Sequence, residues 1–274
     1  MGAGSLTKGC MGLLAATIVP LVQRFLNARG LEIRRAAKEQ GEITAAIDVL
    51  SLCVAELQSQ RQDLFFVQIG AHDGLTYDPI RPFVEKHHWG GLLVEPQPPI
   101  FKQLVANYAS EPQLRFENAA LAESDGQATL YSFAPDSNLP AHASMLTSFR
   151  RELLEANGHG YSGKIQETRV PALHPTSLLK KHGVERVDFL QIDTEGYDYQ
   201  ILKMWDFAYT KPALIHFENN FLSAEDFERC TQLLAKQGYR LLTLGIDTIA
   251  YLQTGVAFEE RAKTSALNAG ARRL

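Results

Sequence analysis

The sequence predicts an α/β fold: a mostly parallel seven-stranded sheet whose last strand is antiparallel, preceded by a helical extension. From residue 64 onward, short apolar runs alternate with stretches of helical periodicity. This alternation is typical of a sheet with helices on both faces. The last two apolar runs are joined by only a few residues around Gly245 and Asp247. Such a short connection makes a hairpin, so the final strand must be antiparallel to its neighbour.

The apolar runs define seven expected strands in the main domain. They cover residues 64–69, 91–95, 114–118, 187–192, 213–218, 239–244 and 248–252. Asp78 followed by Pro79 is typical of a helix N-cap and first-turn proline. Ser223 ahead of Asp226 indicates the start of another helix, which Gly238 ends.

Three segments are expected along the chain. Residues 31–62 show helical periodicity, so 1–62 is expected to be an N-terminal helical extension, 63–253 the main domain and 254–274 a C-terminal tail. Within the main domain, residues 127–171 interrupt the strand and helix alternation with a hairpin strand, "ATLYSF", and another strand near 168–171. A long insertion in this position is expected to shape a site.

Composition excludes some functional classes. The 274 residues are 45% hydrophobic and 21% charged, with a net charge of -4 and no run of Lys or Arg. This disfavours nucleic acid as a partner. Cys10, Cys53 and Cys230 are far apart and show no metal-binding spacing, which indicates a reducing, cytoplasmic compartment without structural zinc.

The apolar segment 9–22 carries no charge but is shorter than a bilayer span and contains Pro20. A helix packed on the domain is the favoured interpretation. A peripheral membrane contact is an alternative, as is a span or a cleaved signal.

The first expected strand runs into a glycine-bracketed turn, "GAHDG", in which His72 and Asp73 lie between Gly70 and Gly74. Glycine allows positive φ and close approach of a ligand to the backbone. The GxGxxG pattern of a dinucleotide site is absent, which favours a cofactor without a pyrophosphate. A simple tight turn remains an alternative for the glycines alone.

Polar residues follow the next two strands. Glu95 lies at the end of the second strand, where a carboxylate can accept hydrogen bonds from both ribose hydroxyls. After the third strand, Asn118 and Ala119 are candidates for contacts with adenine. A solvated glutamate and an ordinary strand exit are the alternatives.

The fourth and fifth strands end in acids. Asp193 and Glu195 are two residues apart at the end of the fourth strand, and Gly196 turns the chain into a helix. His216 and Glu218 share one face of the fifth strand by its two-residue period. A packed core histidine is the alternative interpretation of His216. Converging carboxylates are costly unless they bind hydroxyls, a cation or a metal.

Together these motifs resemble the FkbM family of S-adenosylmethionine-dependent methyltransferases, from about residue 64 to 252. The resemblance lies in "FFVQIGAHDG", "WGGLLVEPQPPIFKQLVANY", "ENAAL", "VDFLQIDTEGYDYQILK" and "PALIHFE". It implies the class I methyltransferase (Rossmann-like) fold, S-adenosylmethionine as cofactor and O-methylation of a sugar, glycan or natural product.

The resemblance also implies residue roles. Gly70, His72 and Gly74 form the loop around the methionine part of the cofactor, and Glu95 is the ribose ligand. Asn118 and Ala119 lie beside adenine, and Asp193 and Glu195 form an acidic pair. The family commonly has Asn at the position of His72, so this chain departs from the pattern there.

Transfer of a methyl group to oxygen requires a base that removes the hydroxyl proton. We expect Asp193 or His216 to be this base, and Glu195 to bind a substrate hydroxyl or the amino group of the cofactor. Glu218, with His142 and Ser144 in the 134–165 insertion, is expected to bind the acceptor. No metal is expected, although magnesium held by Asp193, Glu195 and Glu218 is an alternative. The rival functions are an NAD-dependent oxidoreductase and an inactive binding module.

Overall fold

The computed structural model describes residues 48–134, 146–157 and 165–252. The chain divides into two compact units: helix α2 (Val49–Gln60) belongs to one, and the described residues from 61 onward belong to the other. The apolar segment 9–22 and most of the expected N-terminal helix lie outside the described residues, as does the C-terminal tail.

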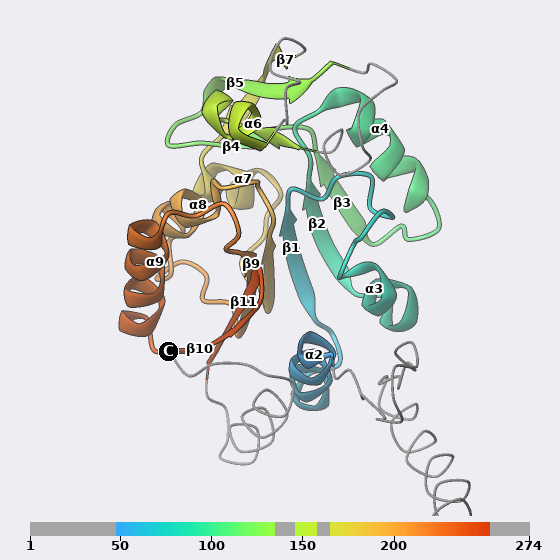
Figure 1. Ribbon diagram of the computed structural model, residues 1–274. Helices are drawn as coiled ribbons and strands as arrows, with labels where there is room; N and C mark the ends of the chain where they lie inside the picture. Colours follow the sequence, from blue (N-terminus) through green and yellow to red (C-terminus); the bar gives the residue numbers. More distant parts are fainter. Residues whose placement is uncertain (1–47, 135–145, 158–164, 253–274) are drawn as a thin grey trace, which may run out of the picture. The chain divides into compact units, whose positions relative to one another are not determined.

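All seven expected strands form one sheet, in the order β10-β11-β9-β8-β1-β2-β3 (Figure 1). Strands β1, β2, β3, β8 and β9 pair in parallel, and β11 is antiparallel to both β9 and β10. The antiparallel last strand is therefore confirmed, and this sheet with its reversed member is that of the class I methyltransferases. The bounds are β1 (Phe65–Ile69), β2 (Gly90–Val94), β3 (Leu114–Glu117), β8 (Phe189–Ile192), β9 (Leu214–Glu218), β10 (Tyr239–Leu244) and β11 (Asp247–Leu252).

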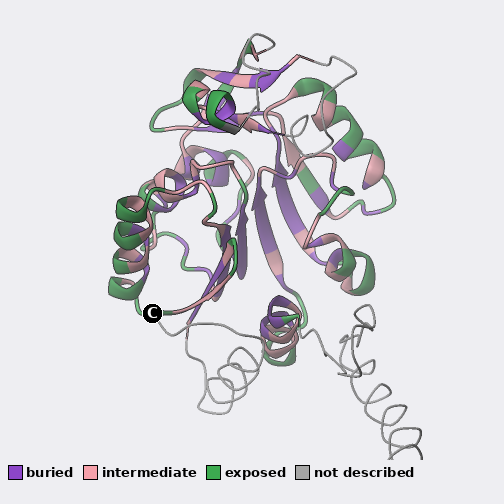
Figure 2. Cartoon of the chain, in the orientation of Figure 1, coloured by how far each residue is buried: buried purple, intermediate pink, exposed green. Residues whose placement is uncertain are grey.

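Helices cover both faces of this sheet (Figure 1). On one face, α7 (Pro175–Lys181), α8 (Asp198–Met204) and α9 (Ala224–Lys236) pack against strand residues such as Val67 and Ile192. The other side carries α3 (Arg81–His87) and α4 (Pro98–Asn107). Because both faces are covered, the central strands β1, β2 and β8 are almost continuously buried, whereas the helices expose their outer faces (Figure 2).

The insertion builds a second sheet, which the sequence did not predict beyond its hairpin. Strands were expected in both places, and β5 (Gly126–Phe133) pairs antiparallel with β7 (Ile165–Leu173). Two short strands, β4 (Ala120–Leu121) and β6 (Thr147–Ser148), extend it to the order β4-β7-β5-β6. Helix α6 (Arg151–Asn157) contributes Leu153 and Leu154 to a small separate core under this sheet.

Two helix starts were predicted, and one was wrong. Ser223 caps α9 by accepting a hydrogen bond from the Asp226 N–H at 3.1 Å, as expected. Helix α3, however, begins at Arg81 with Ile80 as its N-cap, not at Asp78. The Asp78 carboxylate accepts from the N–H groups of Ile80 and Arg81, so it still satisfies the helix start from outside the helix. In the described part of the chain, no helix has the length and apolar character to cross a membrane.

Candidate functional site

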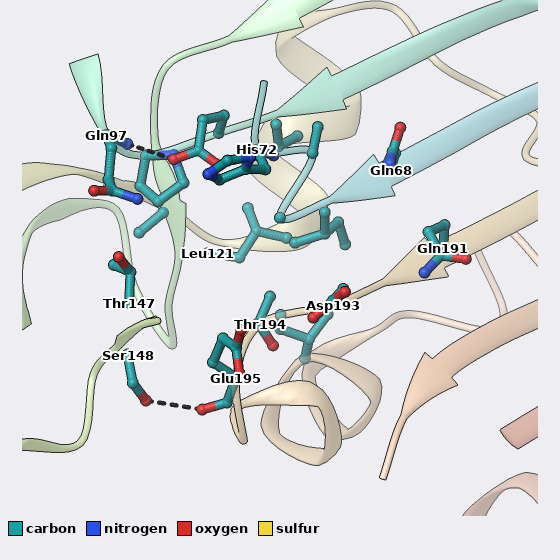
Figure 3. Close-up of a pocket in the computed structure, with 18 of the residues that line it drawn as sticks. Gln68, His72, Gln97, Leu121, Thr147, Ser148, Gln191, Asp193, Thr194 and Glu195 are labelled. Atoms are coloured by element: carbon teal, nitrogen blue, oxygen red, sulfur yellow. Dashed lines mark hydrogen bonds between the residues drawn. The ribbon is translucent and has the colours of Figure 1, made fainter. Parts of the chain in front are cut away.

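A cavity lies at the carboxyl ends of β1, β2 and β8, where the sequence placed the candidate residues (Figure 3). In a doubly wound sheet this edge is the place where ligands bind. The predicted residues Gly70, His72, Glu95, Ala119, Asp193 and Glu195 all line it.

The turn after β1 lies directly against the end of β8. A Cβ atom at Gly70 would overlap the backbone carbonyl oxygen of Asp193, and Gly70 has φ +79°. Only glycine fits both the space and the conformation. The glycine therefore joins two walls of the cavity, and the residues on either side of it face the same space.

Glu95 is held at the end of β2 with 3% of its surface exposed. Its carboxylate accepts hydrogen bonds from the backbone N–H groups of His72 at 3.0 Å and Gln97 at 2.8 Å. Burial raises the pKa of Glu95 to about 7 although these N–H groups favour the charged form. The Gln97 side chain also bonds to this carboxylate, so about one of its four acceptor positions is left for a ribose hydroxyl.

The turn after β8 presents two acids to the cavity. Glu195 has φ +52°, an unfavourable conformation for a residue with a side chain, and its Oε2 atom is buried without a hydrogen-bond partner. Asp193 faces the opening and remains accessible to solvent. The surrounding protein and the carboxylate of Asp247 raise the pKa of Asp193 to about 6.

The acids at these strand ends influence one another. Desolvation and the carboxylates of Asp193 and Asp198 raise the pKa of Glu195 to about 8. Desolvation raises the pKa of Glu218 to about 9. The nearby acids Asp193, Glu195, Asp198 and Asp247 add to this rise. Among the described ion pairs, none involves Asp193, Glu195, Asp198 or Glu218. This edge of the sheet therefore gathers acidic side chains that form no ion pair with a described cation, and their raised pKa values keep Glu195 and Glu218 mostly protonated at neutral pH.

His216 lies one layer below the cavity and does not line it. Its ring is 8% exposed, and its Nδ1 atom is 2.6 Å from Oε1 of Gln191 on the neighbouring strand. Because an amide oxygen only accepts, Nδ1 is the donor. Nε2 lies 3.7 Å from a carboxylate oxygen of Asp247. Gln191 itself does line the cavity, so His216 contacts the site through Gln191.

Three other predicted residues also lie outside the cavity lining. A Cβ atom at Gly74 would press against Tyr108 and Leu104, so this glycine allows helix α4 to pack against the turn. The Asn118 side chain donates to the backbone carbonyls of Glu95 and Pro96, and Glu218 is not among the lining residues. His142 and Ser144 lie outside the described residues.

Several lining residues were not predicted. Gln68 and Gln191 are partners across the neighbouring strands β1 and β8, and each is 3% exposed. Thr147, Ser148 and Phe149 reach the cavity from the second sheet. The buried Oε1 of Gln68 and Oγ1 of Thr147 lack hydrogen-bond partners. The two glutamines could have been predicted from the sequence, because each is a polar residue inside an otherwise apolar strand.

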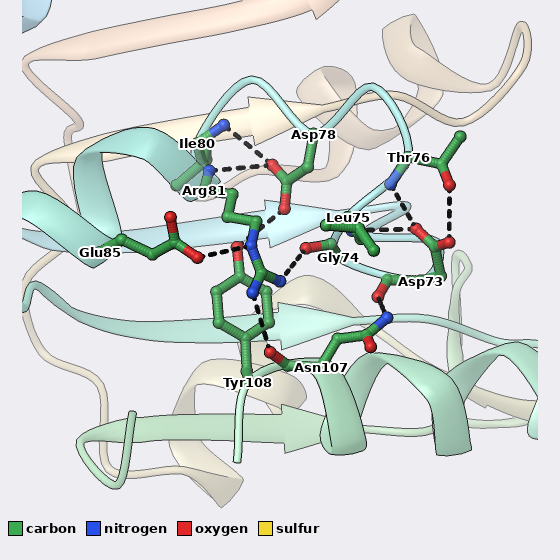
Figure 4. A network of polar contacts seen from close by, with 10 residues as sticks. All are labelled: Asp73, Gly74, Leu75, Thr76, Asp78, Ile80, Arg81, Glu85, Asn107 and Tyr108. Atoms are coloured by element: carbon green, nitrogen blue, oxygen red, sulfur yellow. Dashed lines mark hydrogen bonds and ion pairs between the residues drawn. The ribbon is translucent and has the colours of Figure 1, made fainter. Parts of the chain in front are cut away.

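A polar network fixes the loop between β1 and α3 (Figure 4). The Arg81 guanidinium donates to the carbonyls of Gly74 at 2.7 Å and Asn107 at 3.0 Å. The Asp78 carboxylate accepts from Tyr108 Oη at 2.8 Å and Gln68 Nε2 at 3.1 Å. Thr76, Tyr77 and Asp78 line the cavity, so this network holds one of its walls.

The described residues contain no group of three or more His, Cys, Asp or Glu arranged to hold a metal ion. Cys53 and Cys230 are buried free thiols.

Comparisons with known proteins agree with this architecture. The model of the methyltransferase FkbM domain family matches residues 68–241, which is more than half of the chain. Among curated proteins, none matches the sequence.

The chain also resembles several solved structures at low identity. A methyltransferase FkbM from Methylobacillus flagellatus KT has a TM-score of 0.45 and 11% identity, covering 69% of this chain and 44% of its own. This chain therefore spans less than half the length of that protein. A fibrillarin pre-rRNA processing protein from Methanococcus jannaschii has a TM-score of 0.39 and 12% identity, with 81% and 84% covered. A precorrin-6y C5,15-methyltransferase from Geobacter metallireducens GS-15 has a TM-score of 0.38 and 12% identity, with 80% and 93% covered.

The match to the family model shows the family of this chain. The matched segment contains the glycine turn, Glu95 and the acidic turn after β8. The chain belongs to the FkbM family of S-adenosylmethionine-dependent methyltransferases.

Proposed function

We propose that this protein methylates a hydroxyl group of a sugar, a glycan or a natural product. One observation carries the proposal: a carboxylate suited to ribose, Glu95, and an acid suited to a base, Asp193, line the same cavity. The acceptor class follows from the family resemblance, and an anionic acceptor is disfavoured because Asp193, which is mostly ionised at neutral pH, lines the cavity.

The lining residues fit the cofactor. Glu95 is buried at the strand end with acceptor capacity left for the ribose, and Ala119, Ala120 and Leu121 offer an apolar surface for adenine. The turn at Gly70 and His72 would hold the methionine part. When bound, S-adenosylmethionine supplies a methyl group on a sulfonium, which is already strongly electrophilic.

The chain must then orient the acceptor hydroxyl and remove its proton. Asp193 is our proposed base, because it lines the cavity and its pKa of about 6 keeps it mostly ionised at neutral pH. Glu195 would bind either a hydroxyl of the acceptor or the amino group of the cofactor. His216 would act indirectly through Gln191, and a direct role for Glu218, His142 or Ser144 in acceptor binding stays a prediction.

The alternative, an NAD-dependent oxidoreductase, is not favoured, since the turn after β1 lacks GxGxxG and the family model is that of a methyltransferase. The cytoplasmic location expected from the cysteines stays a prediction.

A methyl-transfer assay tests the proposal. S-adenosylmethionine labelled in its methyl group would be incubated with panels of glycosides and polyhydroxylated natural products, and labelled products would be identified by mass spectrometry. We expect label on an acceptor oxygen, and S-adenosylhomocysteine, unlike NAD, to raise the melting temperature. Stabilisation by NAD alone would contradict the proposal.

A further inference from the structure

The second sheet holds the Glu195 turn directly. The Ser148 hydroxyl, 1% exposed in β6, donates a hydrogen bond to the Glu195 carbonyl oxygen at 2.9 Å (Figure 3). The next residue, Gly196, has φ +92°, and a Cβ atom there would lie 3.0 Å from Leu153 of helix α6. Two parts of the insertion therefore contact the turn in which Glu195 adopts its left-handed conformation.

This conformation is costly and needs an external support. A residue with a side chain at positive φ is strained, and such strain persists where the surroundings enforce it, often at a functional site. Glu195, which is held in this conformation, lines the cavity. Its Oε2 atom is buried and has no hydrogen-bond partner. A buried acceptor without a donor, on a side chain that lines a cavity, can accept a hydrogen bond from a ligand bound there.

The position and charge of Glu195 indicate which ligand group is missing. The Glu195 turn follows Asp193, whose backbone lies against Gly70, so Glu195 is close to the turn proposed to hold the methionine part of the cofactor. The acids that face Glu195 are Asp193 from the end of β8, Asp198 from α8 and Glu218 from the end of β9. A donor that is also a cation satisfies Oε2 and favours the ionised form of Glu195 among these acids.

We propose that Ser148 is a positioning residue that holds Glu195 so that its free oxygen accepts a hydrogen bond from the α-ammonium group of the cofactor. This inference rests on the proposed function and adds to it a role for the second sheet in cofactor binding.

Cofactor binding should then release a proton. Desolvation and the acids Asp193 and Asp198 raise the pKa of Glu195 to about 8, so the ligand-free side chain is mostly protonated at pH 7. A cation next to the carboxylate favours its ionised form. The proton that leaves Glu195 passes to the buffer.

Titration calorimetry at pH 7 with two ligands tests the inference. S-adenosylhomocysteine carries the α-ammonium group, whereas 5′-methylthioadenosine keeps the adenosine and the thioether but lacks the amino-acid end. Each titration would be repeated in two buffers of different ionisation enthalpy to count released protons. We expect the wild type to bind S-adenosylhomocysteine more tightly and to release a proton only with that ligand.

Two variants should change the affinity for one ligand and leave the affinity for the other unchanged. Glu195→Gln should weaken S-adenosylhomocysteine about tenfold and remove most of the proton release, because the charge-assisted hydrogen bond is lost. Ser148→Ala should weaken the same ligand roughly fivefold, the equivalent of one hydrogen bond. Neither should change the affinity for methylthioadenosine. The control is Ser132→Ala, a similarly buried serine of the same sheet that bonds Gln166, and it should change neither affinity.

The outcomes distinguish this inference from the proposed function. If the wild type binds S-adenosylhomocysteine but Glu195→Gln leaves its affinity and proton release unchanged, or weakens both ligands equally, the inference is wrong. If only Ser148→Ala has no effect, the positioning role of Ser148 is wrong. If the wild type binds neither ligand, the proposed function itself fails. Should Ser148→Ala not fold, Glu195→Gln still tests the ammonium contact.

Discussion

The backbone carbonyl oxygen of Asp193 occupies the space that a Cβ atom at Gly70 would fill. The ends of β1 and β8 are therefore in direct backbone contact at this point. This contact brings the glycine turn and the acidic turn to one cavity, although more than 120 residues separate them in sequence. Residues proposed to bind a cofactor and residues proposed to remove a proton are adjacent because of it.

Replacing Gly70 should cost more than its backbone conformation explains. We expect Gly70→Ala to destabilise the chain by about 2–4 kcal/mol, since the methyl group adds a steric overlap to the strain at positive φ. Gly183→Ala is the matched control, because Gly183 has φ +59° with open space around it. Urea denaturation of both variants measures the difference. Equal losses would show that the contact with Asp193 relaxes easily.

Glu95 should be the main determinant of adenosine binding. We expect Glu95→Gln to weaken the binding of S-adenosylhomocysteine at least tenfold, because the amide has one acceptor oxygen where the carboxylate has two to serve both the backbone N–H groups and the ribose. Glu117→Gln serves as the control: Glu117 also ends a strand, but its carboxylate pairs with Lys181 and His182 outside the cavity lining. Calorimetry gives both affinities. Equal affinity in Glu95→Gln and the wild type would remove Glu95 as the ribose ligand.

Replacing Asp193 should mainly reduce the rate of methyl transfer, whereas replacing His216 should mainly reduce stability. We expect Asp193→Asn to reduce kcat about 100-fold or more with little change in S-adenosylhomocysteine affinity, as for loss of a general base. His216→Gln should mainly lower stability, because the flexible amide does not place its donor where the imidazole Nδ1 donates to the buried Gln191 oxygen. Steady-state rates with an identified acceptor and thermal denaturation separate the two effects. A larger loss of kcat in His216→Gln than in Asp193→Asn would reverse our choice of base.

The stability of the ligand-free protein should fall as the pH rises. Glu95, Glu195, Asp198 and Glu218 have pKa values raised to about 7, 8, 7 and 9, mainly by desolvation. Each acid holds a proton in the folded chain that the unfolded chain has already lost, so its stabilising contribution is present at low pH and lost as the pH rises from about 5 towards 9. Denaturation midpoints across this range measure the slope.

Glu218→Gln gives this pH dependence a specific test. The amide cannot ionise, so the variant should lose less stability than the wild type between pH 7 and pH 9, where Glu218 titrates. The control is Glu228→Gln on the exposed side of α9, which should keep the wild-type slope. A wild-type slope in Glu218→Gln would show that Glu218 ionises normally.

Much of the fold was predictable because its signals are local. Apolar runs located all seven strands of the main sheet, and the short connection around Gly245 fixed the antiparallel last strand. The start of α3 was misplaced because Asp78 accepts from backbone N–H groups just outside the helix, which from sequence alone looks like an N-cap. Strands β4 and β6 have two residues each and no periodicity to detect.

The site was predictable where residues follow strand ends, and less so where packing decides. Glu95, Asp193 and Glu195 line the cavity because the carboxyl ends of parallel strands meet at one edge. Gly74 was read as a cofactor contact, but its place against Tyr108 depends on helix α4, which no local pattern reveals. The contact of Ser148 with the site could not be predicted, because its partner, Glu195, lies 47 residues further along the chain.

The most direct test of the central claim is a crystal structure of the protein with S-adenosylhomocysteine. We expect the ribose hydroxyls within hydrogen-bond distance of the Glu95 carboxylate and the sulfur directed towards the space beside Asp193. Adenosine bound away from Glu95, or a ligand at another place on the chain, would contradict the account.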